Sequence, residues 1–286
     1  MLAVALTIAG SDSSGGAGIQ ADLKAMFANG VYGASVLTAI TAQNTHSVTG
    51  VHVLPAAFVT QQLDAVASDL TVRATKTGML ATAAIIEAVA AGVTRHGLRP
   101  LVVDPVMVAT SGATLLQERA LVALKTRLLP LATLVTPNSV EAARLVGHPV
   151  ETLAQAREAA QAIAALGCGA VLIKGGHLGV EASAAAATGR PDDDDAVVTD
   201  LLWDGVRFTT FDRPRLATRH THGTGCTLAS AITARLARGD GLIAAITEAC
   251  AYLHGAIGHG LDLGAGPGPT DHGWFLDRSR RFSDPG

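Results

Sequence analysis

The chain has 286 residues, 49% of them hydrophobic and 16% charged, and a net charge of -3 at pH 7. This balance, with no basic cluster, excludes the usual signature of a nucleic-acid-binding protein, and no stretch has the roughly 18 uninterrupted apolar residues that a membrane span needs. The three cysteines show no metal-like spacing, which is typical of a reducing compartment. We therefore expect a soluble cytoplasmic protein, with neither nucleic acid nor membrane as a partner.

Short apolar runs that end in turn residues alternate with longer alanine-rich segments of helical spacing. The runs are residues 3–9, 35–42, 74–77, 101–104, 133–136 and 170–174. This alternation predicts an α/β fold, with one doubly wound, mostly parallel sheet and helices on both of its faces. We expect residues 1–286 to form a single domain of this kind.

The last part of the predicted sheet differs from the rest. Residues 197–203 and 206–211 flank Asp204-Gly205, a tight-turn dipeptide, so the sheet is expected to end in an antiparallel pair at one edge. Before this hairpin, residues 180–196 include four adjacent aspartates, which repel one another and favour solvent. We expect this segment to be a surface insertion.

The first apolar run opens into a glycine-rich segment at residues 10–18. Its glycine spacing does not match the Gly-x-Gly-x-x-Gly fingerprint of dinucleotide-binding proteins, and Gln43 stands where that fingerprint needs an acidic residue. A Walker A motif is also absent from the sequence. If the protein uses a nucleotide, it belongs to neither of these classes.

Residues 218–239 form a polar, glycine-bearing turn that runs into an alanine-rich helix. Gly223 and Gly225 let successive N–H groups point the same way at the helix N-terminus, which favours an anion such as a phosphate. Cys226 lies in the first turn, where the helix dipole would stabilise its thiolate. Phosphoryl or acyl transfer is one reading, and an ordinary helix start with a buried cysteine is the other. His220 and His222 are expected to shape the turn by hydrogen bonds rather than bind zinc.

Polar residues end several of the other runs, at the edge of the sheet where ligands gather. Asp104 with Asn138 and Glu141 can hold a hydrated Mg²⁺, although a helix cap of Asn138 and Glu141 explains that pair equally. Lys174 either contacts a phosphate or forms an ion pair. Gln43 either reads a flat heteroaromatic ring or serves its own loop, and Met79 is either a wall of the ligand site or part of the core.

The chain resembles the hydroxymethylpyrimidine and phosphomethylpyrimidine kinases of thiamine biosynthesis, in the ribokinase-like superfamily. The segments that carry the resemblance are, in chain order, residues 8–22 (Ile-Ala-Gly-Ser-Asp-Ser-Ser-Gly-Gly-Ala-Gly-Ile-Gln-Ala-Asp), 41–45 (Thr-Ala-Gln-Asn-Thr), 76–80 (Lys-Thr-Gly-Met-Leu), 103–107 (Val-Asp-Pro-Val-Met), 136–142 (Thr-Pro-Asn-Ser-Val-Glu-Ala), 174–177 (Lys-Gly-Gly-His) and 220–227 (His-Thr-His-Gly-Thr-Gly-Cys-Thr). They follow the order of the family over residues 1 to about 240.

The resemblance implies an ATP-dependent phosphotransferase that needs Mg²⁺. It would phosphorylate 4-amino-5-hydroxymethyl-2-methylpyrimidine and then convert the monophosphate to the diphosphate. A homodimer is also expected. The alternatives are a pyridoxine or pyridoxal kinase, which would act on a similar flat alcohol, and a pyrimidine sensor without catalytic activity.

The resemblance also implies a role for individual residues. The pyrimidine would be surrounded by Gly10, Asp22, Gln43, Met79 and Val106, and the anion hole would be formed by Gly223, Thr224, Gly225 and Cys226. Asp104 and Glu141 would lie near magnesium, Lys174 would contact a nucleotide phosphate, and Cys226 would be the catalytic base. Two segments depart from the family pattern, residues 180–196 and 264–272, and no site residue is expected in the second.

Overall fold

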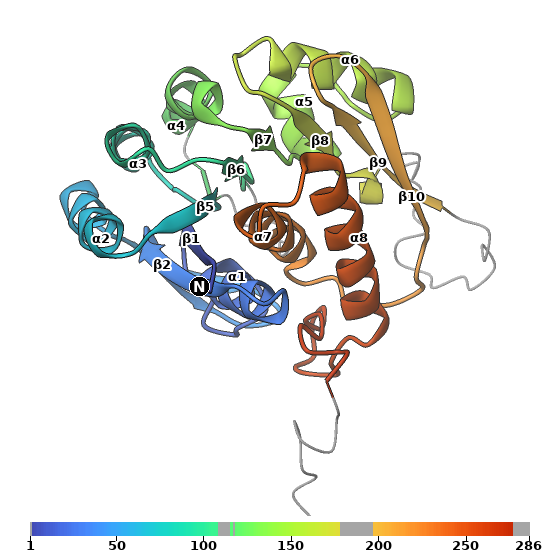
Figure 1. The fold of residues 1–286 in the computed structure, drawn as a ribbon. Coiled ribbons are helices and arrows are strands. Elements are labelled where there is room, and N and C mark those ends of the chain that lie inside the picture. Colours follow the sequence, from blue (N-terminus) through green and yellow to red (C-terminus); the bar gives the residue numbers. More distant parts are fainter. Residues whose placement is uncertain (1, 108–114, 117, 178–196, 277–286) are drawn as a thin grey trace, which may run out of the picture.

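The computed structural model describes residues 2–107, 115–116, 118–177 and 197–276. A sheet of eight strands runs through the middle of the molecule, in the order β10-β9-β8-β7-β6-β5-β1-β2 (Figure 1). Its strands are β1 (Val4–Ala9), β2 (Tyr32–Leu37), β5 (Val72–Thr77), β6 (Leu101–Val103), β7 (Leu134–Val135), β8 (Val171–Ile173), β9 (Val197–Trp203) and β10 (Phe208–Pro214).

Within this sheet β2, β1, β5, β6, β7 and β8 are parallel, each paired with the next in this order. Strand β9 pairs antiparallel with both β8 and β10. The expected antiparallel pair is therefore confirmed at the β10 edge. Asp204 shapes its turn, because its carboxylate accepts the backbone N–H groups of Val206 and Arg207. The expected insertion at 180–196 lies outside the described residues.

Helices cover both faces of the sheet, as the sequence predicts (Figure 1). On one face lie α1 (Gly18–Ala28), α7 (Thr224–Ala237) and α8 (Leu242–Gly258). On the other face lie α2 (Ala56–Asp69), α3 (Ala83–His96), α4 (Glu118–Ala123), the π-helical turn η1 (Leu124–Leu128), the 3-10 turn η2 (Leu129–Leu131), α5 (Ser139–Val146) and α6 (Leu153–Ala164). A further 3-10 turn, η3 (Gly175–His177), follows β8.

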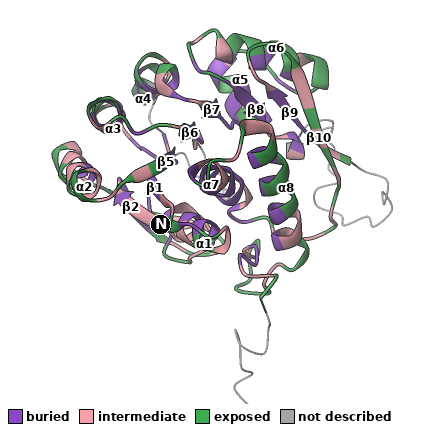
Figure 2. Cartoon of the chain, viewed as in Figure 1, coloured by how far each residue is buried: buried purple, intermediate pink, exposed green. Residues whose placement is uncertain are grey.

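Neighbouring residues of one strand enter different cores. Leu101 and Val103 pack against the helices on the α3 side, whereas Val102 packs on the α7 side. Because both faces are covered, the inner strands β1, β6, β7 and β8 are largely apolar and buried, whereas β2, β9 and β10 towards the two edges are partly exposed (Figure 2). No helix within the described ranges is long and apolar enough to cross a bilayer.

The sequence predicts one strand over the apolar run at residues 35–42. In the structure this run belongs to two different strands. The chain leaves the central sheet after Leu37, and Ala39–Gln43 (β3) pairs antiparallel with Val48–Val53 (β4) in a separate small sheet. Thr38 marks the break, because its hydroxyl donates to the carbonyl O of Met79 at 2.6 Å. This small sheet carries Gln43 away from the central sheet.

Candidate active site

Helix α7 begins close to the glycine-rich segment at residues 10–18. Gly223, its N-cap, has φ of +79° and so adopts a conformation that favours glycine. A Cβ at this position would also collide with the carbonyl O of Gly16. The N–H groups of Gly225 and Cys226 make no hydrogen bond to another described residue, as is usual in a first helical turn. They are available to an anion.

Lys174 lies directly in front of this helix start. Its Nζ is 3.0 Å from the position that a Cβ on Gly225 would occupy, and 2.8 Å from Oδ1 of Asp104. Glu141 Oε2 lies 3.7 Å from the same Nζ. Burial works against the ammonium form, yet Asp104 and Glu141 raise the pKa of Lys174 above its usual value. The lysine is thus a fixed cation between two carboxylates and the predicted anion hole.

The strand end that carries Lys174 is anchored by a third buried carboxylate, that of Asp200. Asp200 on β9 accepts the N–H of Gly175 at 2.6 Å and pairs with Arg213 on β10 at 2.7 Å. Gly175 is packed so tightly against β9 that a Cβ would collide with the carbonyl O of Thr199. The loop after Lys174 therefore has little freedom where it leaves the sheet.

Glu141 also caps its own helix. Asn138 accepts the N–H of Glu141 at 2.8 Å, and Glu141 Oε2 accepts the N–H of Asn138 at 2.8 Å, which is the capping box expected as one reading of this pair. Burial raises the pKa of Glu141; Lys174 lowers it and the nearby Asp104 raises it. Two buried carboxylates this close to each other favour a cation between them.

Mg²⁺ fits the donors of this site if substrate and water complete its shell. Asp104 is bonded through Oδ1 to Lys174 and Thr136, whereas its Oδ2 lies 3.9 Å from the Cβ position of Gly225, on the side of the anion hole. One or two carboxylates with phosphate oxygens are a usual magnesium environment. No group of three or more metal-type side chains occurs among the described residues, so the protein alone supplies only part of a shell.

Cys226 lies between the N-termini of two helices, because it belongs to the first turn of α7 and its thiol accepts the N–H of Gly18 at the start of α1. Burial raises the pKa of Cys226 to about 11, although the nearby Lys76 lowers it. The helix N-terminus was expected to favour the thiolate. In this environment burial has the larger effect, and the group is a thiol at neutral pH.

Asp22 lies underneath this site and is completely buried. Its carboxylate is 2.9 Å from the Nζ of Lys76, and it accepts hydroxyl groups from Thr7 and Ser230 at 2.6 Å each. Burial opposes the charge of Lys76, but Asp22 and, more weakly, Cys226 and Asp104 raise the pKa of Lys76. Every carboxylate oxygen of Asp22 is used within the protein, so it faces donors of the protein and not a cavity.

No role is expected for Lys76 from the sequence, yet it is the largest fully buried side chain among the described residues. Its ammonium lies 2.8 Å from the position that a Cβ on Gly78 would occupy, which explains why this place suits glycine. The available signal was a lysine inside a strand expected to be buried, since such a residue needs a carboxylate partner. Lys76 and Asp22 join β5 to α1, and Ser230 joins both to α7.

The residues expected around the pyrimidine divide into two groups. Met79 packs with Ala39 and Ala81, and Val106 packs against that cluster. Gly10 lies beside it, because a Cβ on Gly10 would be 3.1 Å from Sδ of Met79. These residues form one apolar wall, whereas Asp22 lies below it and Gln43 on the small sheet.

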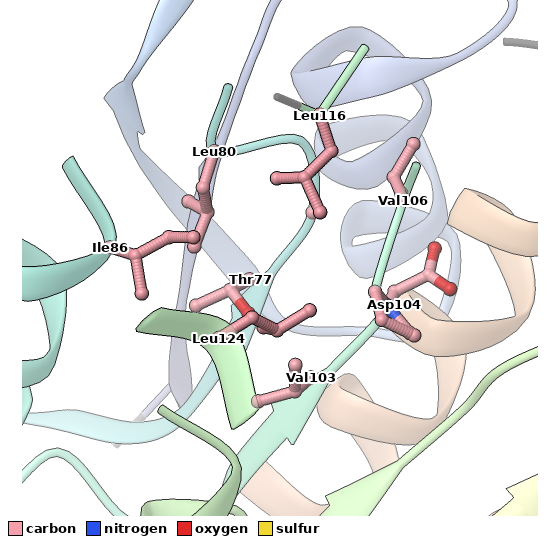
Figure 3. A pocket seen from close by; sticks show the side chains of 10 residues that line it. Thr77, Leu80, Ile86, Val103, Asp104, Val106, Leu116 and Leu124 are labelled. Atoms are coloured by element: carbon pink, nitrogen blue, oxygen red, sulfur yellow. The ribbon is translucent and has the colours of Figure 1, made fainter. Parts of the chain in front are cut away.

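A pocket opens next to this wall, between the ends of β5 and β6 and the helices α3 and η1. Its lining residues are Thr77, Gly78, Leu80, Ile86, Val103, Asp104, Pro105, Val106, Leu116 and Leu124. In Figure 3 the aliphatic side chains surround the pocket and the Asp104 carboxylate points away from them. Val106 therefore lies where the apolar pocket meets the polar part of the site.

The glycine-rich segment connects the two ends of the site. Ser13 Oγ accepts the N–H of Gln43 at 2.8 Å and donates to the carbonyl O of Gln43 at 2.7 Å. At the other end, Asp12 Oδ2 is 2.8 Å from Nε2 of His222, in the turn before α7. Burial favours the neutral acid, but hydrogen bonds from His222 and Ser14 lower the pKa of Asp12 to about 2.

These bonds bring the regions around Gln43 and Cys226 to one segment of backbone, because Gln43 is bonded to Ser13 and Cys226 to Gly18. The amide of Gln43 is near Thr41, whose Oγ1 lies 3.3 Å from Gln43 Oε1, and is otherwise uncommitted among the described contacts. His222 forms a turn-shaping hydrogen bond, as expected, and His220 contacts Asp262 at 3.0 Å.

A doubly wound sheet with a lysine, two carboxylates and a helix N-terminus at the carboxyl ends of its strands is the architecture of a small-molecule kinase. The sequence model described as phosphomethylpyrimidine kinase matches residues 12–271. The chain belongs to the phosphomethylpyrimidine kinase family. The family and the kinase class expected from the sequence are thereby confirmed.

Known proteins of similar sequence or structure agree with this membership. The chain is 51% identical to a hydroxymethylpyrimidine/phosphomethylpyrimidine kinase of Rhizobium meliloti, over 97% of this chain and 100% of that one. It is also 51% identical to a thiamine biosynthesis bifunctional protein of Geobacter sulfurreducens, covering 93% of this chain but spanning only about half (51%) of that relative. A Bacillus subtilis pyridoxal kinase, solved as an ADP complex, has a TM-score of 0.85 and 38% identity, covering 96% of this chain and 99% of that one.

Proposed function

We propose that this protein transfers the γ-phosphoryl group of ATP to the hydroxymethyl group of 4-amino-5-hydroxymethyl-2-methylpyrimidine, and then transfers a second one to the resulting phosphate. The observation that carries the proposal is the placement of Lys174 against Gly225. A cation and a set of uncommitted backbone N–H groups lie next to each other at the edge of the sheet. This is the environment that a transferring phosphoryl group needs.

Positioning and charge neutralisation would supply most of the catalysis. In a loose phosphoryl-transfer transition state the charge lies on the equatorial oxygens, and little covalent work is left for the protein. The N–H groups of Gly225 and Cys226 would bind these oxygens from one side, and Lys174 from the other. The residues that hold Lys174 and Gly223 in place would fix the geometry of the site before any substrate binds.

Asp104 and Glu141 would hold a magnesium ion on the side of Lys174. When bound there, Mg²⁺ neutralises phosphate charge and orients the nucleotide. Asp104 contributes Oδ2, the oxygen that does not bond Lys174, while Glu141 remains part of its capping box. Lys174 contacts both carboxylates, with its Nζ 2.8 Å from Asp104 and 3.7 Å from Glu141.

Cys226 would act as the general base of the first step only. The hydroxymethyl group must lose a proton as it attacks phosphorus, and Cys226 is the titratable group at the start of α7. Because the thiol has a pKa of about 11, its basic form is scarce at neutral pH but strongly basic once formed. In the second step the nucleophile is an anionic phosphate oxygen, which needs no base.

The apolar wall of Gly10, Met79 and Val106 would bind one face of the pyrimidine, with the amide of Gln43 reading its ring edge. A coupled assay of ADP release with the pyrimidine alcohol and separately with its monophosphate tests the proposal. We expect ADP release with both substrates, and Gln43→Ala should raise KM for both more than tenfold. Gln62→Ala, at a glutamine on α2 that binds Leu37 backbone groups, is the matched control. Absence of ADP release with either substrate would refute the proposal.

Pyridoxine or pyridoxal is the second candidate substrate, favoured by the likeness to the pyridoxal kinase structure over most of both chains. A flat heteroaromatic alcohol of similar size suits the same wall. Parallel measurements of kcat/KM on the pyrimidine alcohol and on pyridoxal decide between them. We expect the pyrimidine to be preferred, because Gln43 can donate and accept at once.

We also propose that the protein is a cytoplasmic homodimer. Cys168, Cys226 and Cys250 are all free, which suits a reducing compartment. The small sheet leaves Val51 and Val53 exposed at 44% and 36%, an apolar surface that a second copy would cover. Sedimentation equilibrium of the purified protein would measure the subunit number, and a monomer at micromolar concentration would contradict a homodimer.

A further inference from the structure

The C-terminal segment contacts the beginning of α7. Residues 268–272 pass beside the turn at His222, whose N–H donates to the carbonyl O of Gly268, and Asp271 N–H donates to the carbonyl O of Ala256 on α8. His272 is buried, at 7% exposure, and its carbonyl O accepts the hydroxyl of Tyr252 at 2.8 Å. Sequence analysis assigns no site residue to this segment, and the match to the family ends at residue 271.

The imidazole of His272 reaches a buried threonine one turn into α7. Its Nε2 is 3.0 Å from Oγ1 of Thr227, and the same hydroxyl oxygen is 2.9 Å from the carbonyl O of Gly223. A hydroxyl has one proton, so it can donate to only one of these two groups. Both contacts are hydrogen bonds only if Thr227 donates to Gly223 and the Nε2–H of His272 donates to Thr227.

His272 is a neutral imidazole in this environment. Burial and the charge of Lys24 lower its pKa to about 4, although Asp271 raises it. At neutral pH one ring nitrogen therefore carries a proton and the other does not. Thr227 is completely buried, so no solvent competes for its hydroxyl.

The carbonyl that receives these bonds belongs to the first peptide unit of the predicted anion hole. Gly223 O accepts both the hydroxyl and the backbone N–H of Thr227, each at 2.9 Å. The peptide unit is planar, so fixing the carbonyl of Gly223 also fixes the direction of the Thr224 N–H. That plane in turn sets the path of the backbone into Gly225.

We infer that His272 is a positioning residue for phosphoryl transfer, which orients the N–H groups at the start of α7 through Thr227 and Gly223. The inference rests on the proposed function for its effect on the rate, but not for its effect on the backbone. His272 touches neither substrate nor the transferring group. It contributes by holding the donors in the direction that the transition state requires.

The test compares His272→Leu, which keeps bulk but loses the donor, with His272→Gln, whose Nε2 can reach the same place. Thr227→Val removes the hydroxyl with little change of shape. We expect His272→Leu and Thr227→Val each to lower kcat about tenfold or more in both phosphorylation steps, since removing an oxyanion donor outright costs about a hundredfold to a thousandfold. KM for the pyrimidine should stay within twofold, and His272→Gln should recover most of kcat.

A double-mutant cycle separates positioning from packing. If both residues act through one hydrogen-bond chain, the variant with both changes should lose no more of kcat than the worse single variant. Tyr252→Phe is the matched control, because it loosens the same segment without touching the imidazole. It should lower the melting temperature as much as His272→Leu does while changing kcat less. Additive losses of kcat, or no recovery by glutamine, would overturn the inference.

Amide hydrogen exchange supplies a readout that needs no activity. In the protein without ligand, the amide of Thr227, which donates to Gly223 O, should exchange faster in His272→Leu and Thr227→Val than in the wild type and in His272→Gln. Unchanged exchange in both variants would overturn the inference even if the wild type is an active kinase. If exchange changes as expected but the wild type releases no ADP, the proposed function fails while the hydrogen-bond chain stands.

Discussion

Lys174 and Gly225 come from opposite faces of the polar site and nearly touch, since the lysine Nζ is 3.0 Å from where a glycine Cβ would stand. Lys174 directly follows β8, and Gly225 belongs to the first turn of α7. The absence of a side chain on Gly225 leaves room for the ammonium in front of the backbone N–H groups. A phosphate that enters this space meets a positive charge and amide donors together.

Replacing Lys174 by methionine should remove the positive charge while keeping a chain of similar length. We expect kcat/KM to fall about a hundredfold or more in both phosphorylation steps, because the charge is aimed at the transferring group. KM for ATP should rise as well. Lys125→Met, on η1 and away from the site, is the control. Steady-state kinetics with each substrate would contradict the role of Lys174 if the loss stayed under threefold.

Replacing Gly223 by alanine tests the contact between α7 and the glycine-rich segment. The new Cβ would collide with the carbonyl O of Gly16, and the backbone conformation at φ of +79° adds strain. Gly97→Ala is a matched control, because Gly97 also has a positive φ, +61°, but nothing lies within 4 Å of its Cβ position.

We expect Gly97→Ala to cost about 1 kcal/mol of unfolding free energy, the usual range for alanine in this conformation. Gly223→Ala should cost more and should also lower kcat for both steps, because the anion hole shifts with it. Urea unfolding and steady-state assays measure the two effects. Equal kcat in the two variants would show that the packing of Gly223 on Gly16 is unrelated to catalysis.

Replacing Cys226 by alanine should affect the two half-reactions unequally. With a pKa of about 11, the thiolate fraction rises roughly tenfold for each pH unit between 7 and 9. If the thiolate is the base, kcat/KM for the alcohol rises with pH over this range, and the rise disappears in Cys226→Ala. The second phosphorylation should lose less and depend less on pH. An identical pH profile for the variant and the wild type would rule out the thiol as the base.

The buried pair of Lys76 and Asp22 should be essential to stability. Lys76→Met leaves the Asp22 carboxylate without its cation in the core, and removing one partner of a buried pair costs about 3 to 5 kcal/mol. Asp22→Asn should be similarly destabilising. Changing both together should cost less than the sum, because no unpaired charge remains. Unfolding in urea checks this, with the exposed pair of Asp64 and Arg95 as a control whose loss should change stability far less.

Much of the fold follows from the sequence for a simple reason. A strand that is buried on both faces must be a continuous apolar run, so β1, β5, β6, β7 and β8 can be located within one or two residues of their observed ends. The same pattern joins β2 and β3, because Thr38 turns the chain through a hydrogen bond to Met79, 41 residues away. Such a break depends on a tertiary contact and leaves no periodic signal.

The sequence predicts which residue types form the site, but it does not predict how far each of them is buried. Strand ends bring Asp104, Glu141 and Lys174 together, and the glycine-bearing helix start lies opposite, as the sequence indicates. Spacing does not reveal that Asp22 is buried with Lys76, or that burial outweighs the helix N-terminus at Cys226. Both depend on residues far apart in sequence that meet only after folding.

The glycine-rich segment has a thermodynamic consequence for the order in which ligands associate. Ser13 binds the backbone of Gln43, and Asp12 binds His222 next to the start of α7, so a ligand that immobilises one end restricts the other. The alcohol and the nucleotide should consequently enhance each other's affinity, by the same factor in each direction. Calorimetric titration of a non-hydrolysable ATP analogue, with and without the alcohol, would reveal this synergism as two unequal dissociation constants.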